Sequence, residues 1–145
     1  MRAPAVSGAT RKQTASPGVA GHMTAEDLAE IRAALTRDRT AAIDRLATLE
    51  RELSGLVEAA DTANIDDEHD PEGATTAFER AQVISLMEQA RRQLEAFDAA
   101  DARMAEGTFG LCRRCGEPIA VARLLALPGA TTCLACAQHQ GRQRT

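Results

Sequence analysis

The sequence predicts a mainly α-helical protein in which a long antiparallel helical hairpin, or coiled coil, leads into a small cysteine-rich unit. Three observations favour this fold class. Apolar residues recur at three- and four-residue steps along two long segments, which is the period of amphipathic helices. An acidic stretch that contains Pro and Gly separates the two segments. Two Cys-x-x-Cys pairs follow near the C-terminus.

The composition fits long helices better than a globular core. The 145 residues include no Trp, no Tyr and three Phe, whereas a globular core normally uses more aromatic bulk. The net charge of -4 argues against a generic nucleic-acid binder, which would be strongly basic. No apolar run approaches the roughly 18 residues of a membrane-spanning helix, and no signal-peptide pattern is visible. We therefore expect a cytoplasmic protein with no membrane partner.

The first 23 residues differ from the rest of the chain. Residues 1–23 are rich in Ala, Gly, Pro, Ser and Thr. Such a segment cannot bury enough apolar surface to offset its ordering entropy, so a disordered leader is predicted. Met23 stands directly before the first helix signal and could be a natural start, so the sequence leaves open whether the leader is native.

The hairpin is expected over residues 24–106, and its first helix from Thr24 to about residue 63. Thr24 fits an N-cap, and Asp27 places an acid in the first turn. The first apolar stripe comprises Leu28, Ile31, Leu35, Ala42, Leu46, Leu49, Leu53, Leu56 and Ala60. Asp38 and Arg39 break this stripe, whose period otherwise predicts one amphipathic helix.

An acidic tip is expected over residues 64–75, ahead of the second helix. Two starts for that helix are open, because Thr76 with Glu79 fits a capping box and Asp70 with Pro71 offers an earlier cap. The second apolar stripe comprises Val83, Met87, Ala90, Leu94, Phe97 and Met104.

The two helices are expected to pack against each other within one chain. Neither can bury its stripe alone, and short connections favour antiparallel neighbours. An intermolecular coiled coil is the alternative, but we expect a monomer. Asp101 interrupts the second stripe, and Gly107 stands where a helix C-cap glycine belongs.

Four cysteines dominate the C-terminal part, where a C4 zinc finger with a short C-terminal helix is predicted over residues 107–140. Cys112 and Cys115 form one pair, and Cys133 and Cys136 form the other, at a spacing typical of zinc sites. Four thiolates fill a tetrahedral shell and leave no position for catalytic water, so one structural Zn²⁺ is predicted. Disulfides do not fit a reducing compartment, and no thioredoxin-like context accompanies either pair. Because no nucleophile–base pair, phosphate loop or open metal site is recognisable, we do not expect an enzyme.

The finger resembles the DksA/TraR zinc-finger family in its sequence. It reads Gly107-Thr-Phe-Gly-Leu-Cys112-Arg-Arg-Cys115-Gly-Glu-Pro-Ile, then Arg123-Leu-Leu-Ala-Leu-Pro, then Cys133-Leu-Ala-Cys. The family shows Gly-x-Phe/Tyr-Gly-x-Cys-x-x-Cys-Gly-x-x-Ile, then Arg-Leu-x-Ala-x-Pro, then Cys-x-x-Cys. The resemblance implies a hairpin followed by a finger. It also implies a transcription regulator that binds bacterial RNA polymerase directly through the secondary channel and modulates promoter complexes.

The same resemblance places Asp66, Asp67 and Asp70 at the hairpin tip as partner-binding residues near the catalytic centre of the polymerase. The best-studied members carry Asp-x-x-Asp-x-Ala at the tip. In this chain the two acids are present, but Pro71 follows them and Glu72 stands in place of the Ala.

A further departure concerns the alarmone ppGpp. Leu127 stands where alarmone-responsive members of the family tend to have Arg, so these residues do not support a ppGpp link. The alternative function is a zinc-ribbon protein that binds DNA or another protein partner directly, without action on the polymerase active site. Arg113, Arg114 and Arg123 would supply the basic surface of such a protein. For a regulator that binds RNA polymerase, we expect DNA contact to be secondary at most. Residues 141–145 are expected to form a tail.

Overall fold

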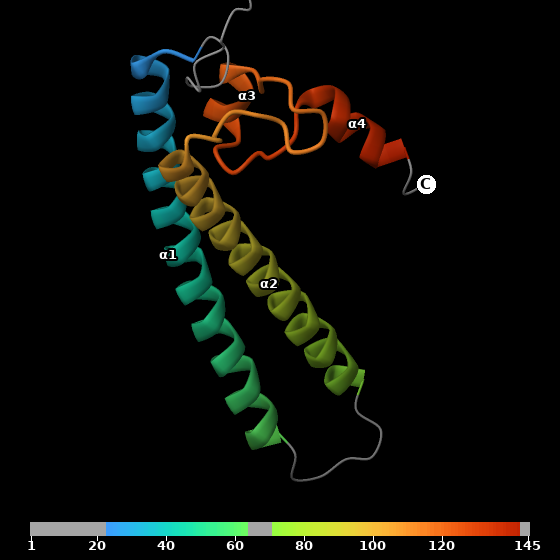
Figure 1. Cartoon of the computed structure of the whole chain (residues 1–145). Helices are drawn as coiled ribbons and strands as arrows, with labels where there is room; N and C mark the ends of the chain where they lie inside the picture. Colours follow the sequence, from blue (N-terminus) through green and yellow to red (C-terminus); the bar gives the residue numbers. More distant parts are fainter. Residues whose placement is uncertain (1–22, 64–70, 143–145) are drawn as a thin grey trace, which may run out of the picture.

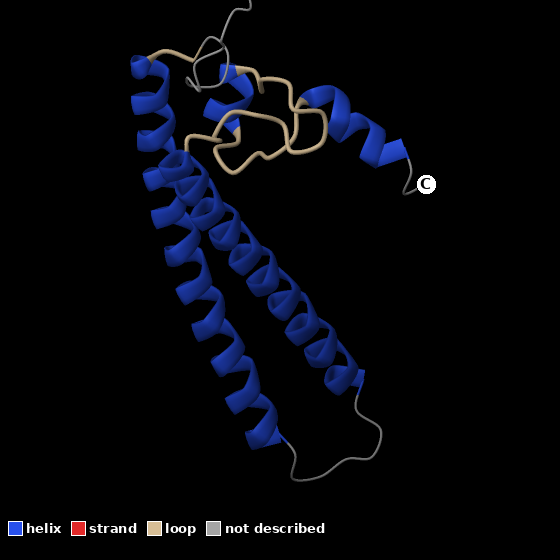
Figure 2. Cartoon of the chain, in the orientation of Figure 1, coloured by secondary structure: helices blue, strands red, loops and turns tan. Residues whose placement is uncertain are grey.

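The computed structural model describes residues 23–63 and 71–142, which form a long two-helix hairpin with a small unit at one end (Figures 1 and 2). The helices are α1 (Ala25–Ala63), α2 (Pro71–Glu106), α3 (Val121–Ala126) and α4 (Leu134–Arg142). Within the described ranges the mainly α fold class is confirmed, with a single isolated antiparallel bridge in the finger. No described helix has the length and apolar character that crossing a membrane requires. The predicted leader and Asp66, Asp67 and Asp70 lie outside the described residues.

Helix α1 begins with a reciprocal cap. The Thr24 backbone N–H donates to Asp27 Oδ2 at 2.8 Å, and the Asp27 N–H donates to Thr24 Oγ1 at 3.0 Å. The hydrogen bond from the Thr24 backbone holds the pKa of Asp27 below its usual value. Two N–H groups that helix geometry leaves without partners are thereby satisfied, as in a capping box with Asp in the acidic position.

Helix α2 uses the earlier of the two starts that the sequence allows. It begins at Pro71, so residues 71–75, which the sequence places in the tip, belong to the helix. Proline suits this position because its ring fixes a helical φ and its missing N–H would have had no helical partner. The helix ends before Gly107, which has φ 72° and occupies the predicted C-cap position.

The core divides into two clusters along the hairpin. The cluster beside the finger consists of nine buried residues: Ile31, Leu35, Ala42, Phe97, Ala100, Phe109, Cys112, Ile119 and Leu124. The cluster toward the tip has three buried residues, Leu49, Val83 and Met87, and half-buried leucines pack around them. All three members of the cluster toward the tip and four of the nine beside the finger come from the predicted stripes. Four others of the larger cluster belong to the finger: Phe109, Cys112, Ile119 and Leu124.

The breaks in the two stripes meet across the hairpin. The Arg39 guanidinium contacts Asp98 through Nη1 at 2.6 Å and Asp101 through Nη2 at 2.6 Å. Arg39 is on α1, and the two acids lie three residues apart on α2, which puts them on one helix face. Polar residues that interrupt both apolar patterns therefore form one link between the helices.

Candidate metal centre

The fold brings the four predicted zinc ligands together. The Sγ atoms of Cys112, Cys115, Cys133 and Cys136 all lie within 4.8 Å of one another, and those of Cys115 and Cys133 are 3.8 Å apart. A tetrahedral zinc site with Zn–S bonds of about 2.3 Å has sulfur–sulfur edges of about 3.8 Å. Four soft thiolate donors at this spacing fit one structural Zn²⁺, as predicted.

The first cysteine pair lies on a tight turn. The Gly116 N–H donates to Cys112 O at 2.9 Å, and the Cys112 N–H donates to Glu117 O at 2.8 Å. Gly116 has φ 76°, a backbone conformation that a residue with a Cβ adopts only under strain. The turn therefore needs the glycine that follows the second cysteine of the motif, and it directs both thiols to the same side.

The second pair uses a helix start instead of a turn. Cys133 directly precedes α4, and its carbonyl accepts the Ala137 N–H at 3.0 Å. Cys136 follows in the first turn of that helix. Thiolates are favoured near a helix N-terminus because the backbone N–H groups there carry partial positive charge. The short predicted C-terminal helix thus helps to form the metal site.

The thiols of the site ionise unequally in the absence of metal. Hydrogen bonds from the backbone of Cys133 and Cys115 lower the pKa of Cys112 to about 6. Burial and the neighbouring thiols raise the pKa of Cys136 to about 12. Four negative sulfurs therefore do not coexist at neutral pH without a compensating cation, and a divalent metal supplies that charge.

The finger is seated on the hairpin through apolar contacts. Phe109, Ile119 and Leu124 are 6%, 3% and 0% exposed and belong to the same cluster as the stripe residues of both long helices. Gly129 lies so close to α2 that an added Cβ would meet the Cβ of Ala96 at 3.2 Å. Helix α3, which carries Leu124, and the close approach of Gly129 to α2 together hold the metal centre at the end of the hairpin.

Arg103 is a residue of this seat that the sequence reasoning missed. Its Nη2 donates to the carbonyl of Thr108 at 3.1 Å and also to the carbonyl of Leu111. Burial, and then the charge of Arg113, lower the pKa of Arg103, while Cys112 opposes this shift. An arginine in the last turn before a C-cap glycine is the sequence signal that could have identified it, because such side chains bond the carbonyls at helix ends.

Comparison with known proteins agrees with this geometry. Residues 107–139 match the family described as the prokaryotic dksA/traR C4-type zinc finger. The finger of this chain is therefore similar to the DksA/TraR-type C4 zinc fingers. A solved structure, transcription factor DksA2 from Pseudomonas aeruginosa, superposes with a TM-score of 0.67 at 28% sequence identity, covering 85% of this chain and 89% of that one. The similarity to DksA2 therefore extends over the hairpin as well as the finger.

Curated relatives match over shorter stretches. The RNA polymerase-binding transcription factor DksA of Caulobacter vibrioides is 35% identical over 72 residues, which are 49% of this chain and 51% of that protein. An uncharacterized protein of Aquifex aeolicus is 40% identical over 50 residues, 34% of each chain. The matched region thus spans about half of the DksA length and a third of the Aquifex protein.

The other predicted site residues are placed differently. Asp66, Asp67 and Asp70 lie outside the described residues, so their role at the tip stays a prediction. Arg113 and Arg114 are exposed beside the first cysteine pair. Arg123 instead turns inward, and its Nε donates to the Thr132 carbonyl at 3.0 Å. The basic finger surface predicted from three arginines is therefore carried by two of them.

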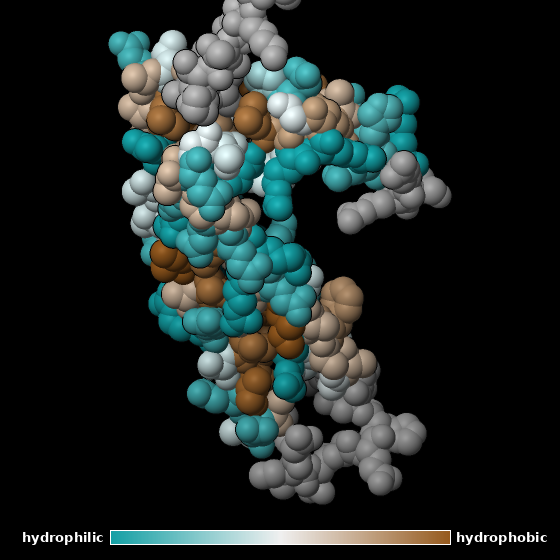
Figure 3. Space-filling model, in the orientation of Figure 1, coloured by the Kyte–Doolittle hydropathy of each residue, from teal (hydrophilic) through white to brown (hydrophobic). Residues whose placement is uncertain are grey.

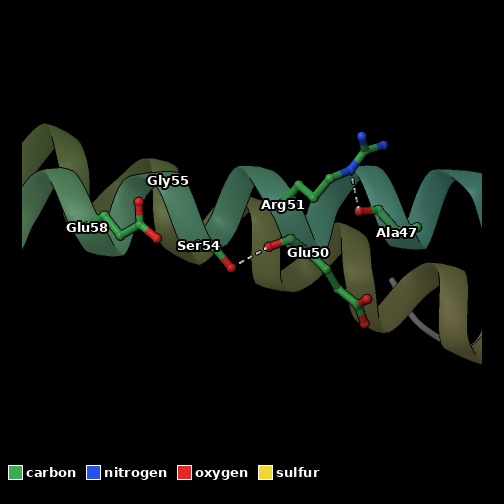
Figure 4. A pocket seen from close by; sticks show the side chains of 6 residues that line it. All are labelled: Ala47, Glu50, Arg51, Ser54, Gly55 and Glu58. Atoms are coloured by element: carbon green, nitrogen blue, oxygen red, sulfur yellow. Dashed lines mark hydrogen bonds between the residues drawn. The ribbon is translucent and has the colours of Figure 1, made fainter.

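Residues of α1 alone line a shallow hollow, and their side chains do not point toward a common centre (Figure 4). Ser54 Oγ donates to the Glu50 carbonyl at 3.0 Å, and Arg51 Nε donates to the Ala47 carbonyl at 3.2 Å. These side chains bond the backbone of their own helix, which is common for polar residues on exposed helix faces.

Proposed function

We propose that this protein is a non-enzymatic bacterial transcription regulator that binds RNA polymerase directly through the secondary channel and modulates promoter complexes. One observation carries the proposal: the hairpin and finger together resemble DksA2 over 85% of the chain. The name of the Caulobacter relative, an RNA polymerase-binding transcription factor, supports the same partner. A cytoplasmic location and a monomeric state follow from this role.

The arrangement of the molecule supports insertion into a narrow channel. With 39 residues, α1 is about 58 Å long at 1.5 Å per residue, and only one other helix lies alongside it over most of that length (Figure 1). The finger widens the molecule at one end. A thin rod with a broad base can reach deeply while the base remains outside.

In this proposal the metal has a structural role. Cys112, Cys115, Cys133 and Cys136 would ligate one Zn²⁺, and the four thiolates would complete its coordination shell. The zinc would hold the finger in the shape that packs on the hairpin, so it would support docking without taking part in a reaction.

The tip acids would act at the far end of the rod. Asp66, Asp67 and Asp70 would approach the polymerase catalytic centre, where carboxylates suit magnesium and repel an incoming triphosphate. A pull-down with core RNA polymerase, followed by a promoter transcription assay, tests the proposal. We expect the wild-type protein to bind and to change transcript yield. Failure of the wild-type protein to bind core polymerase would contradict the proposed function.

A paired variant separates the action of the tip from docking. Changing Asp67 and Asp70 together to Asn should abolish the transcription effect while polymerase affinity stays nearly unchanged. Loss of affinity in parallel with the effect would make these acids docking contacts. An unchanged transcription effect would show that the tip has no part in the activity.

Direct DNA binding by the finger is the second candidate function, and the exposed Arg113 and Arg114 favour it. Binding of this kind would weaken steeply as salt increases, because it releases counterions from the phosphates. Titration of the isolated protein onto a labelled duplex at two salt concentrations tests it.

A further inference from the structure

The three phenylalanines of this chain occupy opposite environments. Phe97 and Phe109 are 3% and 6% exposed and belong to the core beside the finger. Phe78 is 70% exposed and lies on α2, in the half of the hairpin toward the tip. A large aromatic ring in water gains nothing for folding, whereas aromatic side chains are enriched among the anchors of protein interfaces.

A groove lies beside Phe78. It has a volume of about 320 Å³ and runs between α1 and α2, lined by Glu52, Leu56, Glu79, Gln82, Val83 and Leu86. Val83 is buried, while Leu56 and Leu86 are half-buried and remain open to an additional partner. Apolar side chains are visible over this half of the hairpin in Figure 3. Phe78 precedes Gln82 by four residues, so it lies next to the rim of the groove on α2.

The charges of the groove restrict what it can hold. Glu52 and Glu79 are the only charged residues among those that line it, and both are acidic. A nucleic acid or an anionic membrane would bring negative charge against them. A second copy of this chain, related by a twofold axis, would place the same two acids against each other. A protein segment with Lys or Arg beside its apolar side chains complements both features of the groove.

We propose that Phe78 and this groove form a docking surface for a basic, apolar protein segment. The segment belongs to RNA polymerase, an assignment that rests on the proposed function. The half-buried Leu56 and Leu86 receive an apolar side chain of the partner, Phe78 covers it from the rim, and the two glutamates pair with its cations. This contact lies along the side of the rod, apart from the acids at its tip.

The test compares two exposed apolar residues of the same helix. Phe78→Ala removes the proposed anchor. Ile84→Ala is the matched control, since Ile84 is 43% exposed on α2 and does not line the groove. Affinity of the full-length, zinc-loaded protein for core RNA polymerase is measured by biolayer interferometry, and circular dichroism checks that helicity is unchanged. We expect Phe78→Ala to weaken binding at least tenfold and Ile84→Ala to change it less than twofold.

A charge variant provides an independent readout. Changing Glu52 and Glu79 together to Gln should slow association and flatten its salt dependence, because rim charges steer the encounter. The proposal would be overturned if Phe78→Ala bound core polymerase as tightly as the wild-type protein, or if Phe78→Ala and Ile84→Ala lost equal affinity. In either case the binding of polymerase by the wild-type protein would stand. Concentration-dependent dimerisation that Phe78→Ala abolishes would also overturn it, since a second copy would then be the occupant. Absence of polymerase binding by the wild-type protein would instead refute the proposed function.

Discussion

The finger end and the tip half of the hairpin are made from the same two helices, yet they are packed very differently. Beside the finger, nine buried residues form one cluster. Toward the tip, the cluster has three, and the leucines around it are half-buried. Two helices can cover each other along only one face, so full burial requires a third element. At one end the finger supplies it, and at the other the described part of the chain supplies none.

This difference separates stability from availability for binding. The finger end combines apolar burial, a metal centre and the Arg39 link to Asp98 and Asp101. The tip half leaves Phe78 and the groove beside it open. A helix pair that is covered on one side alone leaves apolar surface exposed to solvent, and such a patch commonly marks an interaction site.

The largest expected effect comes from removing zinc. Structural zinc contributes on the order of 10–16 kcal/mol to the folding of small finger domains, so a strong chelator should unfold residues 107–142. Amide hydrogen exchange should then rise in the finger and around Ile31, whose core cluster loses its third layer. Exchange around Val83 should stay unchanged.

Cys133→Ser provides the genetic equivalent of the chelator and should give the same exchange pattern. Metal analysis of the reduced, freshly purified wild-type protein should give one zinc per chain. A wild-type protein without zinc would contradict the predicted metal site. An equal rise in hydrogen exchange at both ends of the hairpin would contradict the difference in packing between the finger end and the tip half.

The next effect is a cavity in the core beside the finger. Leu35 is 3% exposed and lies in the larger cluster, where close packing leaves little freedom to collapse. Leu35→Ala should lower the free energy of unfolding by about 4 kcal/mol, in the upper part of the usual range for such truncations. Urea denaturation of the zinc-loaded protein, followed by circular dichroism, measures it.

The matched truncation in the tip half should cost less. Leu49 is 7% exposed, but half-buried leucines surround it and can move into the space. Leu49→Ala should lower the free energy of unfolding by about 2 kcal/mol, at the low end of the same range. If both leucine variants lost equal stability under identical conditions, the two halves would be equally well packed.

The smallest effect concerns the ionic links. Arg39 pairs with two acids at 2.6 Å, whereas Arg91 contacts Glu50 at 3.5 Å. Arg39→Met should cost about 1 kcal/mol at low salt, and Arg91→Met only a few tenths, because exposed single pairs contribute little. The Arg39 effect should shrink at high salt through screening. An equal cost for the two variants would show that the forked geometry adds nothing.

The two long helices and the cysteine cluster could be predicted from the order of residues alone. The heptad-like stripes predicted two long helices, since a 3.6-residue period leaves one apolar face per helix. The two Cys-x-x-Cys pairs predicted a zinc finger. The short spacing within each pair, and the glycine that follows the first pair in its tight turn, can be recognised in a short stretch of sequence. These features depend on residues near one another in sequence.

Contacts between different helices, and between the helices and the finger, could be identified only in the folded chain. Asp101 and Arg39 look like defects in two separate patterns, and their pairing depends on the register of the hairpin, which periodicity leaves undefined. Phe109 and Leu124 show no stripe, because they lie in short segments, yet they complete the core once the finger folds onto the helices. The exposure of Phe78 likewise depends on the folded chain, because no described element covers that face of α2. Burial depends on which surfaces meet, and only the folded chain brings together surfaces that are distant in sequence.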